Sequence, residues 1–148
     1  MTAEQDKMII RRWFKEAFEK GNTALVDEIF AHDVLSHDRT GPGPNGEWPR
    51  GAEAPRAIIN AYHGAFPDVQ FTIEDQLAEG DIVVTRWSAK GTNRGSLMGA
   101  PATGKTATVT GIEADRIKNG KIAESWANFD VLGMLVQLGL APKPGQSM

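Results

Sequence analysis

The chain has 148 residues, of which 41% are hydrophobic and 24% are charged, the balance of one ordinary globular domain. Its net charge of −3 comes from interspersed signs without a basic stripe, so we expect no nucleic-acid partner. The absence of cysteine excludes a disulfide framework and thiolate metal sites. No apolar run approaches the roughly 20 residues of a membrane span, and segment 1–7 is too polar for a signal peptide. We therefore expect a cytoplasmic protein with no membrane contact and a single domain over residues 1–148, frayed at 141–148.

The N-terminal part of the chain has helical periodicity. Apolar residues at i, i+3, i+4 and i+7 predict a first helix with one buried face, formed by Ile10, Trp13, Phe14 and Ala17. Gly21 ends this helix, and Asn22 or Thr23 can cap a second one. The inward residues of the second helix are expected to be Leu25, Val26, Ile29 and Phe30. Residues 34–38 are predicted to be extended, 39–51 to form a Gly/Pro-rich loop, and 53–65 to form a third helix.

After residue 67 the hydrophobic period changes from 3.6 to 2, which predicts strands. The inward face of the first strand is expected to comprise Val69, Phe71, Ile73, Asp75 and Leu77. A tight turn at 79–81 leads to a second strand (82–90), and a Gly-rich connection (91–105) leads to a third (106–118). Asn119-Gly120 predicts a hairpin into a fourth strand at 121–129. Asp130 is expected to cap a short last helix.

This order of elements predicts an α+β fold. We expect a cone in which three N-terminal helices pack on a strongly curved antiparallel sheet that encloses a pocket, with a short C-terminal helix added. Small molecules bind preferentially in such concave mouths, so the expected partner is an apolar small-molecule ligand.

Two literal motif matches lack the structural context that their chemistry needs. Residues 99–106 satisfy the phosphate-binding P-loop pattern, but they lead into a β-branched stretch instead of a helix. Residues 41–46 match the dinucleotide fingerprint without a surrounding strand–helix–strand unit. We interpret both segments as loops.

The pairs His32-Asp33 and His37-Asp38 carry ligand-type and acid–base side chains. A third metal ligand is not evident, so no metal site is predicted. Asp33 is interpreted as organising a turn. His37 and Asp38 end an extended segment beside the Gly/Pro loop. There Asp38 can act as a base next to a substrate carbonyl, with His37 as its hydrogen-bonding neighbour. The alternative is that Asp38 only makes a local turn bond.

The third strand supplies a second acid–base candidate, Glu113. It shares a face with Val109, Gly111 and Asp115, and if this face is concave, Glu113 is a polar group in an apolar cup. Pairing with Arg86 or Lys90 would instead make Glu113 an ordinary solvated residue.

Aromatic and apolar residues on the predicted strands are candidate ligand contacts. Trp87 can form a flat wall for a ring-shaped ligand, with core packing or a dimer contact as the alternative for Trp87 or Trp126. Phe71 and Val109 are expected beside it, and Trp48 is predicted to belong to a lid.

Several segments resemble the SnoaL-like polyketide cyclases, above all their ester cyclase branch. They are Val34-x-x-His37-Asp38, Ala65-Phe66-Pro67-Asp68, 99–104, 119–122 and the Phe129-Asp130-x-Leu132-Gly133-Met134-Leu135 run. The resemblance covers about residues 4–140. It implies the fold of nuclear transport factor two, shared with ketosteroid isomerase and limonene epoxide hydrolase, and a homodimer through the sheet, which an exposed Trp126 and Ile122 would fit.

The resemblance also implies cofactor-free aldol cyclisation of a polyketide ester by an aspartate on the last strand. Ala127 stands at the position of that aspartate, and Glu113 and Gly111 stand at the family's His and Gln positions. The family mechanism therefore does not transfer directly. Asp38, near where ketosteroid isomerase carries its base, or Glu113 would have to replace the aspartate, with Ser125 and Asn128 assisting by hydrogen bonds.

Three functions remain open at this stage. The first is a cofactor-free enzyme of the cyclase or isomerase type that acts on an apolar carbonyl compound. The second is a binding protein that has lost its acid at Ala127, and the third is a hydratase or epoxide hydrolase that uses His37, Asp38 and Glu113 to hold a water.

Overall fold

The computed structural model describes residues 1–147, which form several helices and one five-stranded sheet. The helical elements are α1 (Ala3–Arg12), the π-helix η1 (Trp13–Phe18), the 3-10 turn η2 (Thr23–Leu25), α2 (Val26–Ile29), α3 (Glu53–Ala65) and α4 (Val131–Gln137). The strands are β1 (Phe30–Ser36), β2 (Gln70–Glu79), β3 (Ile82–Thr92), β4 (Thr106–Lys118) and β5 (Lys121–Phe129). The predicted α+β class is confirmed, and α3, β4 and β5 have the bounds that the sequence predicts.

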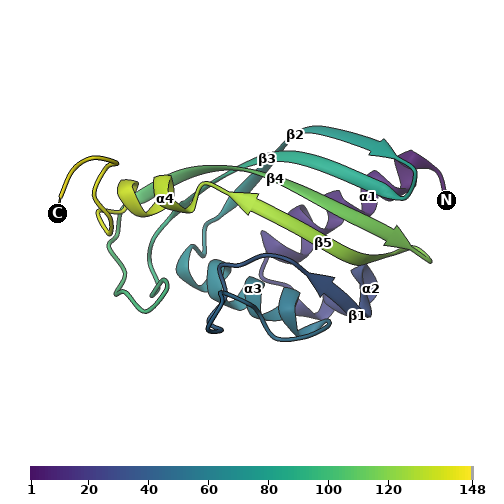
Figure 1. Cartoon of the computed structure of the whole chain (residues 1–148), viewed down its shortest axis with the longest axis horizontal. Helices are drawn as coiled ribbons and strands as arrows, with labels where there is room; N and C mark the ends of the chain where they lie inside the picture. Colours follow the sequence, from purple (N-terminus) through teal and green to yellow (C-terminus); the bar gives the residue numbers. More distant parts are fainter. Residues whose placement is uncertain (148) are drawn as a thin grey trace.

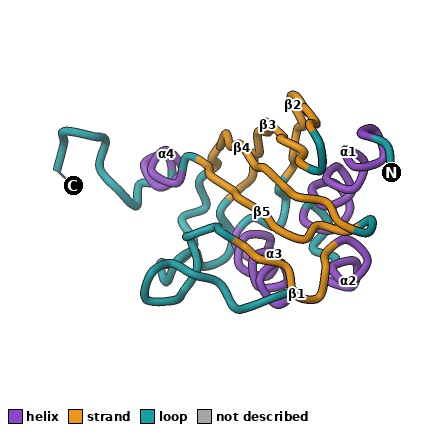
Figure 2. The backbone as a smooth tube through the Cα atoms, turned by 45° about the vertical axis from the view of Figure 1, so that its right-hand side comes forward, coloured by secondary structure: helices purple, strands orange, loops and turns teal. Residues whose placement is uncertain are grey.

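The sheet has the strand order β1-β5-β4-β3-β2. Strands β2 to β5 form the predicted antiparallel meander, whereas β1 runs parallel to β5, so the sheet is mixed. β1 begins at Phe30, four residues earlier than predicted, because Phe30 already pairs with Ile122. Helices α1, α2 and α3 lie together on one side of the sheet, and α4 lies apart from them beyond the end of β5 (Figures 1 and 2). No helix in the described part of the chain is long and apolar enough to cross a membrane.

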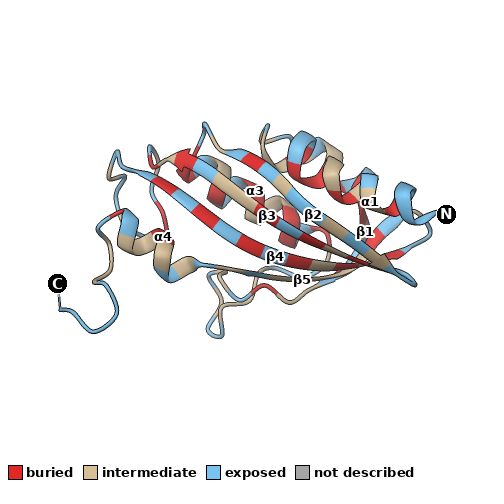
Figure 3. Ribbon diagram, turned by 90° about the horizontal axis from the view of Figure 1, so that it is seen from above, coloured by how far each residue is buried: buried red, intermediate tan, exposed pale blue. Residues whose placement is uncertain are grey.

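Strand β4 alternates between buried and exposed residues along almost its whole length (Figure 3). Its inward residues are Ala107, Val109, Gly111, Glu113 and Asp115, all of them buried. This is the face that period-2 alternation predicts. Two ionisable residues therefore lie on the covered side of the central strand.

Two β-bulges reverse the side-chain alternation that the sequence suggests. In β2 the pairing with β3 shifts between Ile73 and Asp75, so Leu77 is 72% exposed instead of buried. In β5 the shift next to Glu124 turns Ile122 inward, where it is fully buried. The expectation that Ile122 lies on an exposed face is therefore wrong.

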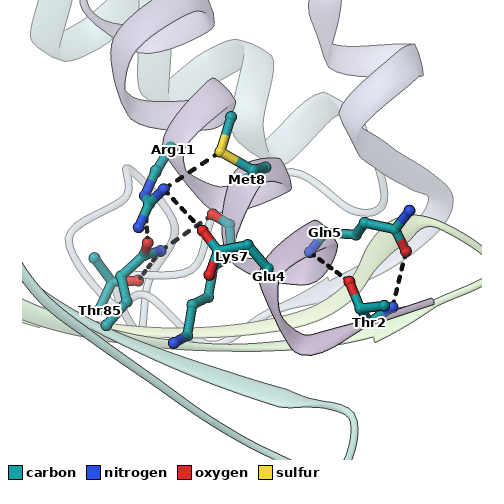
Figure 4. Close-up of polar contacts among 8 residues, drawn as sticks. Thr2, Glu4, Gln5, Lys7, Met8, Arg11 and Thr85 are labelled. Atoms are coloured by element: carbon teal, nitrogen blue, oxygen red, sulfur yellow. Dashed lines mark hydrogen bonds and ion pairs between the residues drawn. The ribbon is translucent and has the colours of Figure 1, made fainter.

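The β2 bulge also turns Gln76 toward α1, where it lies between Arg11 of the helix and Thr85 of β3, both labelled in Figure 4. The Nε of Arg11 donates to Gln76 Oε1 at 2.7 Å, and Gln76 Nε2 donates to Thr85 Oγ1 at 3.1 Å. At the start of α1, Thr2 and Gln5 form a reciprocal capping box. These contacts fix α1, and with it η1, against the sheet.

The Gly-rich connection between β3 and β4 is organised by Asn93, which is fully buried. Its Nδ2 donates to Gly95 O at 2.8 Å, and its Oδ1 accepts from the backbone N and the Oγ1 of Thr103 at 2.8 and 2.9 Å. Gly104 then leads directly into β4. The P-loop reading is thus excluded, because that motif requires a helix at this point.

Candidate functional site

A cavity of about 90 Å³ lies between the concave face of the sheet and the helices η1 and α3. The π-helix contributes Trp13, Phe14 and Phe18, and α3 contributes Ile58 and Tyr62. A π-helix is wider than an α-helix and often occurs at functional sites. Here its residues place three aromatic rings over the sheet.

The sheet side of the cavity is mostly aromatic. Phe71 on β2 and Trp87 on β3 have their ring centroids 5.5 Å apart, and Trp87 and Phe129 on β5 follow at 6.0 Å. Val109 on β4 lines the same wall. The structure therefore brings together three residues predicted to contact the ligand, Phe71, Trp87 and Val109.

Trp87 lies over Gly111, its cross-strand partner on β4. A Cβ atom on Gly111 would lie 2.4 Å from Trp87 Cζ2 and 2.9 Å from Phe129 Cβ. The indole can adopt this position only because residue 111 has no side chain. The indole Nε1 of Trp87 is buried and has no hydrogen-bond partner among the described residues.

Asp38 is buried at the cavity wall and accepts three hydrogen bonds at one oxygen, Oδ1. The backbone N and the Oγ1 of Thr40 both donate at 2.7 Å, and Trp48 Nε1 donates at 3.0 Å. Tyr62 donates its hydroxyl to Thr40 Oγ1 at 2.8 Å. Asp38 thus makes the local turn bond to the following loop and also faces the cavity. No hydrogen bond to Oδ2 is formed within residues 1–147.

Glu113 lines the cavity opposite Ala127 of β5 and is only 6% exposed. Arg86, one of its two alternative partners, pairs instead with Asp75 on the outer face. Burial raises the pKa of Glu113 well above its usual range, and the charges of Asp115 and Asp38 raise it further. Glu113 is therefore expected to hold its proton at neutral pH.

Asp115 lies two residues further along β4, on the same face, and is completely buried. Neither of its carboxyl oxygens has a hydrogen-bond partner in the described chain, and the same is true of Glu113 Oε2. Burial raises the pKa of Asp115 to about 6. Two neighbours lower the pKa of Asp115: Glu113, and Ser125, which is the cross-strand partner of Asp115 on β5.

Four predicted site residues lie outside the cavity lining: His37, Asn128, Ser125 and Trp48. In an extended chain successive side chains point to opposite sides, so His37 cannot share the side of Asp38. His37 instead donates its Nε2–H to Glu124 Oε2 (2.8 Å) and stacks on Trp126 on the outer face. The same alternation places Asn128 on the outer face, away from Ala127 and Phe129. Ser125 faces inward but sits beneath the cavity beside Asp115.

Trp48 belongs to the loop after β1, as expected. It donates a hydrogen bond to Asp38 and does not itself line the cavity. His32 and Asp33 lie in a separate, polar surface groove beside β1. Within residues 1–147 no three His, Cys, Asp or Glu side chains are grouped as a metal site would require.

Sequence reasoning missed the π-helix aromatics, Tyr62 and Asp115 as parts of the site. The sequence predicts Trp13 and Phe14 only as core residues, because a cavity wall and a core have the same apolar pattern. Asp115 was placed on the correct face. A second carboxyl at i+2 from Glu113 on a buried strand was a signal that could have found it.

The model of the SnoaL-like polyketide cyclase family matches residues 8–138. The chain belongs to this family. Its fold is similar to that of TsrD from Streptomyces laurentii, which is 26% identical with a TM-score of 0.82 over 95% of this chain and 98% of that one. IdmH from Streptomyces antibioticus, provisionally named a polyketide cyclase, is 33% identical with a TM-score of 0.78 over 91% and 99% of the two chains.

A more distant relative shares the fold at lower identity. AclR from Streptomyces galilaeus, provisionally named a hydroxylase, is 21% identical with a TM-score of 0.78 over 95% of this chain and 100% of that one. A search of curated proteins finds no match. Proteins with this fold thus have different provisional activities, so the chemistry depends on the residues of each cavity and not on the fold.

Proposed function

We propose that this member of the family is a small enzyme that performs acid–base chemistry on a largely apolar molecule with a carbonyl group, in an aldol-type cyclisation or an isomerisation. The observation that supports it is the pair Asp38 and Glu113, two carboxyl groups in different environments on the wall of one aromatic cavity. When the surroundings of two titratable groups shift their pKa values apart, one group can act as the acid and the other as the base. The proposed reaction uses no cofactor.

Asp38 is the proposed base. Three donors hold its Oδ1, so Oδ2 is the oxygen that can take a proton from the carbon next to the substrate carbonyl. Glu113 is the proposed acid, because its high pKa keeps a proton available for the carbonyl oxygen. The electron pair of the broken C–H bond moves onto that oxygen, which accepts a hydrogen bond from Glu113. The resulting enolate then either attacks a second carbonyl of the same molecule or takes a proton back at another carbon.

The proposal can be tested with 2-tetralone, an apolar bicyclic ketone with acidic protons beside its carbonyl. Proton NMR in D2O measures how fast the protein exchanges these protons, and tryptophan fluorescence measures binding, since Trp13 and Trp87 line the cavity. Asp38→Asn keeps an acceptor for Thr40 and Trp48 but removes the base. Exchange should fall by about 10²–10⁴-fold, the usual contribution of a positioned base.

Asp33→Asn is the matched control, because Asp33 is an exposed carboxylate of β1 outside the cavity. It should leave the exchange rate unchanged. Equal exchange rates in the wild type, Asp38→Asn and Glu113→Gln would sink the acid–base proposal. Exchange no faster than in buffer, combined with saturable binding, would support the alternative below instead.

A non-catalytic binding protein is the second candidate, and Ala127 is the observation that favours it. Ala127 lines the cavity directly across from Glu113, where the family resemblance implies an aspartate. A pocket without that acid can still bind an apolar ligand through its aromatic wall. This alternative predicts binding of 2-tetralone that Asp38→Asn does not change, and no proton exchange.

Homodimerisation through the outer face of the sheet stays a prediction. On this face Ile112 is 53% exposed, and Trp126 is partly exposed between His37 and Arg116. Sedimentation equilibrium of the wild type and of Ile112→Lys tests it. A monomeric wild type would contradict the prediction.

A further inference from the structure

Glu113 and Asp115 lie two residues apart on the same face of β4, and both are buried. Both side chains point to the covered side of β4, and three of their four oxygens are buried without a hydrogen-bond partner. An unsatisfied buried polar atom costs about 1–3 kcal/mol, and more if it is charged. Two ionised carboxylates at this place would both lack hydrogen-bond donors and would repel each other, and both effects would destabilise the folded protein. One proton between them removes the repulsion and supplies the missing donor.

We infer that Glu113 and Asp115 share a single proton, which lies between the two carboxyls when no ligand is bound and turns from Asp115 to a ligand oxygen when one binds. In this inference Asp115 is a positioning residue that keeps Glu113 protonated until the ligand oxygen takes its place as acceptor. This inference deepens the proposed function and rests on it for the role of Glu113. The ligand that fits such a donor carries a carbonyl or an anionic oxygen such as an enolate. Sharing of one proton between adjacent carboxyls is a known way to divide acid and base roles.

The surroundings of the pair fit a shared proton. The cross-strand neighbours of Asp115 are Val83 on β3 and Ser125 on β5, neither of which carries a charge. The ionisable residues that line the cavity with Glu113 are Asp38, Tyr62 and Lys90. On α1, which packs against β2 and β3, the buried ionisable residue is Asp6. Among the causes that shift the pKa of Glu113, the two charged ones are Asp115 and Asp38, and both favour the protonated form.

The test is a carboxyl-carbon NMR titration of the labelled protein, which needs no substrate. In the wild type the Glu113 and Asp115 signals should both respond to the same two titration steps, because strongly coupled groups titrate as a pair. In Asp115→Asn the midpoint of Glu113 should shift downward, since a like charge has been removed. Asp75→Asn, on the exposed face of β2, is the control and should leave both midpoints in place.

Substitutions of Glu113 test the same pair from the other side. Glu113→Leu removes the donor to Asp115, so the Asp115 midpoint should shift upward, whereas Glu113→Gln retains an N–H donor and should shift it less. If Asp115→Asn does not fold, the wild-type titration and these two variants still decide the question. Independent single-step titrations, or unchanged midpoints after substitution of the partner, would overturn the inference.

A kinetic measurement separates this inference from the proposed function. If the acid form of Glu113 is used, 2-tetralone exchange falls at high pH, and in Asp115→Asn this alkaline limb should move to lower pH. Coupled titrations without any exchange activity would leave the shared proton standing and remove the proposed function. Exchange that depends on Asp38, with an alkaline limb unmoved in Asp115→Asn, would remove the role of Asp115 and keep the function.

Discussion

The indole Nε1 of Trp48 donates a 3.0 Å hydrogen bond to Oδ1 of Asp38, ten residues earlier in the same loop. The loop that follows β1 thereby holds the candidate base with a side chain of its own. Trp48 also lies against Tyr62, with ring centroids 6.2 Å apart. The indole is therefore held both by this packing contact and by its hydrogen bond to Asp38. The orientation of Asp38 is thus a property of the loop and of α3.

Trp48→Phe should lower the rate of 2-tetralone exchange while leaving the fold intact. The substitution keeps a ring against Tyr62 and removes the N–H donor, so one of three hydrogen bonds to Asp38 is lost. A loss of about 1.4 kcal/mol in positioning corresponds to a roughly tenfold lower rate. Trp126→Phe on the outer face is the control. Equal rates in all three proteins would show that this bond does not position the base.

The stability of the protein should depend on the protonation of Asp115. Its pKa is about 6 in the folded state against an ordinary value of 3.8, so between these pH values the folded chain binds more protons than the unfolded one. The free energy of unfolding contributed by this group therefore falls as pH rises from about 4 to about 6, by at most on the order of 3 kcal/mol. Urea denaturation of the wild type and Asp115→Asn across this range measures it.

The difference between these two proteins is the informative quantity, because other carboxyls act in the opposite direction at lower pH. Hydrogen bonds from Thr92 lower the pKa of Asp68, and His37 lowers that of Glu124. Their contributions cancel in the comparison. A stability difference that stays constant between about pH 4 and about pH 7 would contradict the raised pKa of Asp115.

Ala127→Asp should destabilise the protein at neutral pH instead of restoring a family-like site. Residue 127 faces Glu113 across the strand pair, so a new carboxylate would join Glu113 and Asp38 on the wall of one apolar cavity, with Asp115 two residues along β4 from Glu113. We expect a loss of about 1–3 kcal/mol in unfolding free energy at pH 8 and a smaller loss at pH 5. Ala127→Asn has the same shape without the charge and should lose less. Equal losses at the two pH values would argue against a charge effect.

Asn93→Ala should loosen the connection between β3 and β4. The substitution leaves the backbone N–H of Thr103 and the carbonyl of Gly95 without their partner at a partly buried position, which should cost about 1–3 kcal/mol. Asn128→Ala, on the exposed face, is the control and should change stability by less than about 0.5 kcal/mol. Urea denaturation measures both, and a small effect at Asn93 would mean that the loop is held elsewhere.

The fold was predictable where one face of an element is covered and the pattern is unbroken. The hydrophobic period alone places α3 at 53–65, and Asn119-Gly120 fixes the hairpin between β4 and β5, because both glycine and asparagine adopt positive φ there. The pattern failed at the bulges. Nothing local in the sequence shows that one residue is inserted near Glu74, and this insertion exchanges the sides of Gln76 and Leu77.

The candidate site was predictable in part, for reasons that depend on single residues. Glu113 stands out as a carboxyl on a strand face that it shares with apolar residues, and Asp38 stands out because it ends an extended segment beside the Gly/Pro loop. The sequence-based prediction groups His37 with Asp38 because they are neighbours in the chain. In an extended chain, however, neighbouring side chains point to opposite faces. The link from Tyr62 through Thr40 to Asp38 joins α3 to the loop, and such tertiary contacts leave no local signal.

Trp87 and Gly111 compete for one volume, and this competition has an evolutionary consequence. A side chain at position 111 and an indole at position 87 exclude each other, so a single substitution at either position meets a steric barrier or leaves a hole. Homologues should therefore divide into two groups, one with tryptophan facing glycine and one with a smaller residue facing a bulkier or polar one. An ancestor that exchanged both positions would have changed the depth of its binding pocket, and with it the size of molecule it accepts, without altering either carboxyl group.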